Sequence, residues 1–156
     1  MQSDLTTLPN GLRIISASRP GTESVSLGIW INTGSAREEE EINGLSHFLE
    51  HMVFKGTPTR TSFQIDAEIE DAGGQTNAYT SREITSFYAK MLKDDAELAL
   101  DVLADIVLNA SFPDEEVVKE RDVVIQEIKQ TIDTPDDIIF DYLQQQAYAG
   151  QPLGRP

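Results

Sequence analysis

The period of the hydrophobic pattern changes along the chain, and this change restricts the fold more than any other feature. Between residues 24 and 34, the apolar residues Val25, Leu27, Ile29 and Ile31 recur at every second position. Alternation of this kind is typical of a half-buried β-strand. Later segments instead repeat their apolar residues with the three-to-four residue spacing of amphipathic helices. The sequence therefore predicts both kinds of element in one chain.

Strand patterns come early in the chain, and helical patterns dominate its second half. We predict a second half-buried strand at residues 11–17, and further strands at residues 76–92, a segment long enough for two strands or a hairpin. We predict helices at residues 45–54, 61–71, 94–109, 114–132 and 136–148. This order favours the α+β class, with an antiparallel or mixed β-sheet covered by α-helices.

Composition limits the partners that this chain can bind. With 156 residues and no internal linker, residues 1–156 are expected to form one domain. There is no cysteine, so disulfides and thiolate metal sites are excluded. A net charge of −15 argues against nucleic acid and favours basic partners, although acidity that only maintains solubility is the alternative. No apolar run is long enough for a membrane span, and no targeting signal is apparent, so we expect a soluble, cytoplasmic protein.

Both histidines of the chain lie in one short motif, HFLEH, at residues 47–51. At 100° per residue, an α-helix places His51 about 40° and Glu50 about 60° from His47, so the three polar groups share one side. Apolar residues occupy most of the remaining circumference, and the helix is therefore expected to be buried. Two adjacent imidazoles are suitable zinc ligands, and Glu50 is placed to act as a general base on a metal-bound water.

Alternative explanations of the two histidines remain at this point. Paired histidines can be ordinary hydrogen-bonded core residues, but the pattern HxxEH on a helix is typical of the inverted zincins. A carboxylate-bridged di-iron bundle needs a Glu-x-x-His motif on each of two helices, whereas this chain has two histidines on one helix. A catalytic zinc site also needs a third protein ligand, which here must be Asp or Glu.

The phase of the helix predicted at 114–132 selects two candidates for that ligand. Glu120 and Glu127 fall within its apolar face, whereas most of its other polar residues fall on the opposite side. Carboxylates on a buried face need a cation or a hydrogen-bonding partner. Glu116 lies in the first turn, where helix N-terminal charge is a sufficient explanation, and we interpret it as structural. Helical phase alone does not rank Glu120 against Glu127.

At this level of detail the sequence resembles the pitrilysin and insulinase family of zinc peptidases, most closely its mitochondrial and bacterial processing peptidase branch with beta-type subunits. The similar motifs are LPNGLRI, GSAREE, HFLEHMVFKGT, GGQTNAYTSRE, ERDVVIQE and PLGRP. The resemblance implies that His47, His51 and Glu127 bind one Zn²⁺ ion. It further implies that Glu50 is the catalytic base and that Glu120 orients a zinc ligand.

The resemblance also implies where substrate binds. In the family, the segment that follows GGQ adds an extended substrate as a further strand, with the residues matching Asn77 and Ala78 positioning the substrate backbone. Such β-augmentation supplies main-chain hydrogen bonds that tolerate many sequences. An ordinary interior hairpin is the alternative for this segment, because exposed sheet edges are usually protected.

By resemblance, the activity is that of a zinc metalloendopeptidase acting on extended, basic, presequence-like peptides. The family implies a homodimer or heterodimer, in the bacterial cytoplasm or alternatively in the mitochondrial matrix. Members continue beyond the PLGR motif, so we expect these residues to be the N-terminal part of a longer enzyme, weakly active or inactive alone, with exposed apolar faces that drive self-association. A non-catalytic subunit or scaffold is the alternative, since some members keep the fold without the site.

Overall fold

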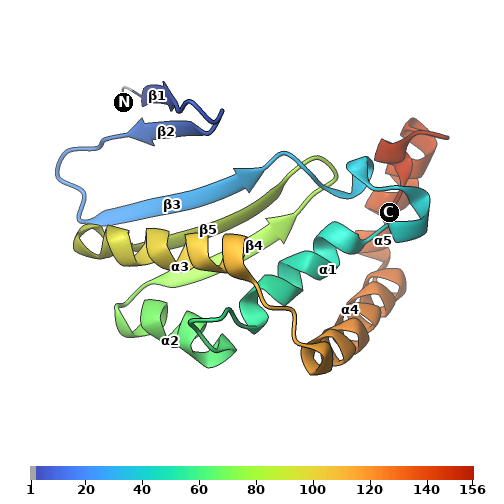
Figure 1. The fold of residues 1–156 in the computed structure, drawn as a ribbon. Helices are drawn as coiled ribbons and strands as arrows, with labels where there is room; N and C mark the ends of the chain where they lie inside the picture. The colour runs from blue at the N-terminus through green and yellow to red at the C-terminus, as the bar shows by residue number, and fades with distance from the viewer. Residues whose placement is uncertain (1–2) are drawn as a thin grey trace.

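The computed structural model describes residues 3–156, and its centre is a three-stranded antiparallel β-sheet (Figure 1). Strand β5 (Thr85–Leu92) lies in the middle, with β3 (Ser24–Ile31) on one side and β4 (Gln75–Thr80) on the other. In the register, Val25 lies opposite Met91 and Ala78 lies opposite Phe87. The prediction of an α+β fold is confirmed, and the sheet is antiparallel rather than mixed.

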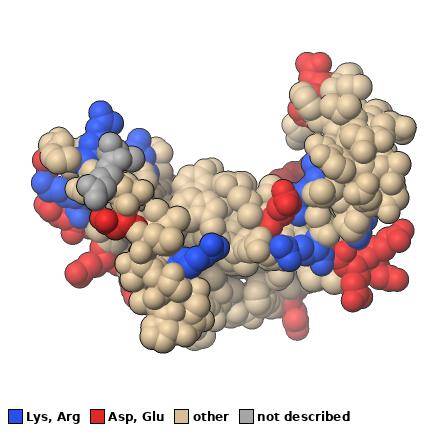
Figure 2. Space-filling model, turned by 90° about the horizontal axis from the view of Figure 1, so that it is seen from above, with Lys and Arg blue, Asp and Glu red and all other residues tan. Residues whose placement is uncertain are grey.

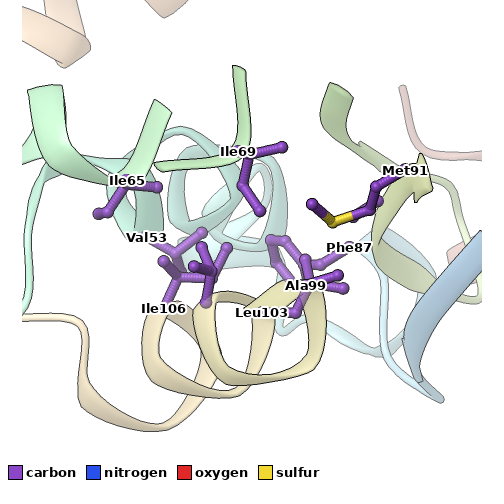
Figure 3. Packing of buried hydrophobic residues seen from close by; sticks show 10 residues of the cluster. Val53, Ile65, Ile69, Phe87, Met91, Ala99, Leu103 and Ile106 are labelled. Atoms are coloured by element: carbon purple, nitrogen blue, oxygen red, sulfur yellow. The ribbon is translucent and has the colours of Figure 1, made fainter. Parts of the chain in front are cut away.

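One face of this sheet carries the hydrophobic core. Alternate residues of β5 point into it, and helices α2 (Ser62–Asp71) and α3 (Ala96–Asn109) supply the opposing side chains (Figure 3). The core cluster consists of Val53, Ile65, Ile69, Phe87, Ala89, Met91, Ala99, Val102, Leu103 and Ile106. Burying such side chains contributes about 1.5–3 kcal/mol each, so this two-layer arrangement fixes the sheet relative to both helices.

A partly buried ionic network packs against helix α3. Arg60 Nη1 donates to Asp105 Oδ2 over 2.9 Å, and the hydroxyls of Thr57 and Thr59 donate to the same oxygen over 2.8 and 3.0 Å. Asn109 donates to the other oxygen of Asp105 over 2.8 Å. The hydrogen bond from Asn109 lowers the pKa of Asp105 most, and with Arg60 and the two threonines it outweighs the opposing effect of burial. The network ties residues 57–60 to α3.

The first two strands form a separate hairpin. Strand β1 (Ser3–Thr7) pairs with β2 (Arg13–Ala17), and neither pairs with the main sheet among the described residues. Every residue of both strands is exposed, including Leu5 and Ile15. The prediction of a half-buried strand at 11–17 was therefore wrong about burial, and the strand at 3–7 was not predicted. Apolar residues alone do not say whether a second layer covers them.

The remaining helices lie beyond the β4 edge of the sheet. Helix α1 (Leu45–Met52) packs beside β4, α4 (Asp114–Asp133) packs against α1, and α5 (Pro135–Ala147) packs against α4 (Figure 1). These bounds agree with the predicted helices to within two residues, and a short 3₁₀ turn at Val53–Lys55 extends α1. Seen from above, the outline is concave between the hairpin end and the end that carries the C-terminal helices (Figure 2).

The prediction that the helix at residues 45–54 is buried was wrong. Within α1 only Met52 is buried, whereas Leu45 and Leu49 are exposed. Much of the apolar surface of α4 and α5 is exposed as well, including Ile128 and Leu143. The described residues place no second layer over these faces, so an apolar helical stripe is open to solvent here. None of the helices within residues 3–156 combines the length and the hydrophobicity that spanning a lipid bilayer requires.

Candidate metal centre

Helix α1 carries the three polar residues of the HFLEH motif. It begins after Gly44, whose φ of 96° lies in the left-handed region that glycine adopts without strain. The helical spacing brings the rings of His47 and His51 together, with centroids 4.9 Å apart and planes at 88° to each other. The two imidazoles therefore lie side by side on one surface of the helix.

Helix α4 brings a carboxylate to these two rings. The Nε2 atoms of His51 and His47 lie 3.4 and 3.7 Å from Oε2 of Glu127. One ligand atom from each of the three residues can be chosen so that all lie within 4.8 Å of one another. Zinc bonds of about 2.0–2.1 Å at tetrahedral angles would separate neighbouring ligand atoms by about 3.3 Å. The cluster therefore has the donor types of a three-residue zinc site, and its two contacts with Glu127 are close to that spacing.

A second carboxylate of α4 contacts His51 at the ring nitrogen that does not face Glu127. Oε2 of the buried Glu120 lies 3.1 Å from Nδ1 of His51, and its Oε1 lies 2.6 Å from Nζ of Lys55. Burial raises the pKa of Glu120, but the hydrogen bonds from Lys55 and His51 outweigh it and the net shift is downward. An ionised Glu120 accepts a hydrogen bond from Nδ1–H of His51, which leaves Nε2 of the same ring free to bind a metal.

Glu50 supplies an independent observation at this site. Its Oε2 atom is buried and has no hydrogen-bond partner among residues 3–156. A buried carboxylate oxygen without a partner is costly, so such groups normally contact water, a cation or a ligand. Glu50 lies on the same helix as both histidines, one turn after His47. The residues present thus fit a metal centre, with a buried carboxylate oxygen on the same helix.

The structure places Glu120 and Glu127 beside the two histidines, with one difference in burial. Glu120 is buried as expected, whereas the side chain of Glu127 is 45 % exposed and that of His47 is 41 % exposed. Glu116 lies 2.5 Å from Lys119, in an ion pair within the first turns of α4 and away from the histidines. The contact of Lys55 with Glu120 was not predicted, because a lysine after a helix has many possible partners.

The segment expected to bind substrate forms an edge of the main sheet. Strand β4 pairs with β5 on one side only, within the part of the chain that the structure describes. Ala78 points toward the core, while Asn77 lies on the opposite face and accepts a 2.8 Å hydrogen bond from the backbone N–H of Ala78. Thr80 Oγ1 donates to the carbonyl of Ser46 over 3.4 Å, which links this edge to α1.

Comparison with known proteins assigns the family. The family model described as Insulinase (Peptidase family M16) matches residues 13–156. The chain belongs to this peptidase family. The resemblance found in the sequence is therefore confirmed, and the residues of the candidate metal centre lie inside the matched region.

Individual family members have similar sequences and folds. An uncharacterized zinc protease of Bacillus subtilis is 49 % identical over 150 residues, covering 96 % of this chain and 37 % of the relative. An Arabidopsis thaliana protein named "Probable mitochondrial-processing peptidase subunit beta, mitochondrial" is 46 % identical over 154 residues. This match covers 99 % of this chain and 29 % of the Arabidopsis protein. The crystal structure of a Helicobacter pylori protease superposes with a TM-score of 0.92 at 26 % identity, covering 99 % of this chain and 37 % of that structure. The chain spans about a third of the length of these relatives.

Proposed function

We propose that this chain carries the zinc-binding and catalytic residues of a metalloendopeptidase. The observation that supports this proposal most directly is the convergence of His47, His51 and Glu127 from two helices onto one point. Two imidazoles and a carboxylate form a common protein ligand set of catalytic zinc, which leaves a fourth position for water or substrate. Membership of the M16 peptidase family makes peptide-bond hydrolysis the reaction to expect.

Each residue of the centre has a distinct task in this proposal. His47, His51 and Glu127 hold the ion, and Glu120 keeps the His51 ring in the tautomer that presents Nε2. When bound, zinc supplies Lewis acidity, which polarises a peptide carbonyl and lowers the pKa of water to about 7. Glu50 accepts the proton of the attacking water and then delivers it to the amine of the leaving peptide. The buried Oε2 of Glu50, which has no hydrogen-bond partner within residues 3–156, is suited to this transfer.

Strand β4 is the proposed binding site for the substrate backbone. An extended peptide would add to its open edge, with Asn77 and Ala78 as the nearest positions. Because α1 packs beside β4, a peptide on this edge runs close to the histidines. The net charge of −15 favours basic, presequence-like peptides.

We further propose that residues 1–156 alone hydrolyse peptides weakly or not at all. His47 and Glu127 are each more than 40 % exposed, so water has free access to the centre. Catalytic groups act more strongly where water is excluded and the substrate is held in place. In a longer chain, further residues would supply that enclosure, and a homodimer or heterodimer is the proposed assembly. The proposed location is the bacterial cytoplasm, with the mitochondrial matrix as the alternative.

Substitution Glu50→Gln tests the catalytic assignment. The longest available form of the protein should lose hydrolysis of a basic fluorogenic peptide by at least about 100-fold, because general base catalysis is removed. Its zinc content, measured by plasma emission spectrometry after dialysis, should equal that of the unchanged protein. Undiminished turnover in Glu50→Gln would refute the role of Glu50. Metal analysis also tests the alternative of a non-catalytic subunit, which predicts no stoichiometric zinc.

A further inference from the structure

The first turn of α1 is capped by a residue from a different segment. The N-cap residue, Gly44, has no side chain that could accept a hydrogen bond from the helix. Instead, the carboxylate of Glu38 accepts hydrogen bonds from the backbone N–H groups of Gly44 and Ser46, each over 2.6 Å. Glu38 is itself buried, with 8 % of its surface exposed. A buried carboxylate thus satisfies two amides at the start of the metal-binding helix.

The length of α1 makes this external cap important. The helix has eight residues, and helices of this length are marginal without contacts from the rest of the fold. A carboxylate at a helix N-terminus also interacts favourably with the helix dipole. His47 follows directly after Ser46, so the position of the first turn sets the position of the first imidazole. At the same turn, the carbonyl of Ser46 accepts the bond from Thr80 of β4.

The PLGR turn near residue 154 holds Glu38 in place. Nη1 of Arg155 donates a 2.8 Å hydrogen bond to the backbone carbonyl of Glu38. The adjacent Gly154 is buried, and a Cβ atom there would lie 2.4 Å from the carbonyl oxygen of Tyr148. Only glycine allows this close approach, which brings Arg155 back from the end of α5 to Glu38. The motifs GSAREE and PLGRP therefore meet at the N-terminus of α1.

We propose that Glu38 is a positioning residue for the metal centre, and that Arg155 supports it. Glu38 fixes the first turn of α1 so that His47 reaches the same point as His51 and Glu127. The inference rests on the proposed zinc site, but it adds two residues that contact neither the metal ligands nor the substrate edge directly. Loss of the cap should loosen the first turn of α1 and weaken metal binding without unfolding the core.

Glu38→Gln tests this proposal with zinc itself as the probe. Competition with a chromophoric chelator should show zinc affinity reduced by about 10-fold, the lower end of what distant support of a ligand usually costs. In the metal-free protein, hydrogen exchange of amides 45–49 should accelerate relative to amides in α3. Thr61→Ala is the matched control, because Thr61 is the N-cap of α2 and accepts from Gln64 N, and α2 carries none of the candidate metal ligands. It should lower thermal stability but change zinc affinity by less than about 2-fold.

The possible outcomes separate this inference from the proposed function. If the unchanged protein binds no zinc, both are wrong. If the unchanged protein binds zinc and Glu38→Gln binds it with equal affinity, only the positioning role is refuted. The same holds if the zinc affinity of Glu38→Gln is no lower than that of Thr61→Ala when the two variants are equally stable. Should Glu38→Gln fail to fold, Arg155→Gln removes the support of Glu38 while leaving its carboxylate. That variant should weaken zinc binding by about 3-fold, and unchanged affinity would overturn the proposal.

Discussion

Replacing Glu120 with Gln should weaken zinc binding by about 10–100-fold. The substitution preserves the size of the side chain but removes the charge that holds both His51 and Lys55. Glu120 lies 3.1 Å from His51 Nδ1 and its side chain is only 10 % exposed, so water does not readily replace the lost acceptor. The predicted change corresponds to about 1.4–2.7 kcal/mol in binding free energy.

The same substitution should also lower the stability of the metal-free protein. Lys55 is 24 % exposed and would lose its partner at 2.6 Å. Leaving a partly buried ammonium unpaired should cost about 1–2 kcal/mol, which is less than for a fully buried pair because solvent still reaches Lys55. Urea denaturation followed by circular dichroism measures this cost separately from the zinc affinity.

The control for Glu120→Gln is Glu116→Gln on the same helix. Glu116 pairs with the exposed Lys119 and does not contact the histidines, so its loss should leave zinc affinity unchanged within about 2-fold. Titration of both variants against a competing chelator gives the comparison. Equal affinity of Glu120→Gln and Glu116→Gln would refute the idea that the Glu120 carboxylate orients His51.

Three further predictions concern stability and association. Asp105→Asn should lower the free energy of unfolding by about 2–4 kcal/mol, as measured in urea, because Arg60 loses its most buried partner; a loss below about 1 kcal/mol would contradict this. The folded-state pKa values of Asp105 and Glu38 are lowered, so the stability they provide is complete above about pH 5 and is lost as pH falls through their folded pKa values. Urea midpoints that stay constant from pH 6 to pH 3 would argue against this pH dependence. Light scattering should detect concentration-dependent association that Leu143→Lys reduces, since Leu143 is 61 % exposed on α5; identical scattering of the two proteins would show that this face is not responsible.

Local pattern was sufficient to predict most of the secondary structure. The alternation in β3 and the helical spacing in α3 and α4 reflect side chains that pack on one face, which is the feature periodicity reports. Burial of the hairpin, α1 and the later helices could not be predicted in the same way. An apolar face such as that of β2 is buried only when another element covers it, and sequence period carries no information about that element.

The candidate site was predictable to the extent that its residues share a helix. His47, Glu50 and His51 follow from one short motif, and helical phase selected Glu120 and Glu127 together. Their different contacts, Glu120 at Nδ1 and Glu127 at Nε2 of His51, depend on how α4 crosses α1. Phase within one helix does not determine such a crossing.

The cap of α1 was not predicted because it is not local. Glu38 lies six residues before Gly44 and reaches its amide across the 3₁₀ turn at Glu40–Ile42. Capping rules search the residues next to a helix start, where Gly44 offers no side chain. Arg155 is more distant still, and its contact with Glu38 joins segments 117 positions apart. Contacts of this kind require the tertiary structure.

X-ray diffraction at the zinc absorption edge, from crystals of the zinc-loaded protein, tests whether α1 and α4 together bind one zinc ion. We expect one anomalous peak bonded to Nε2 of His47, Nε2 of His51 and a carboxylate oxygen of Glu127, at about 2.0–2.2 Å from each. A zinc-replete crystal with no peak between α1 and α4, or with the ion bound elsewhere, would contradict it.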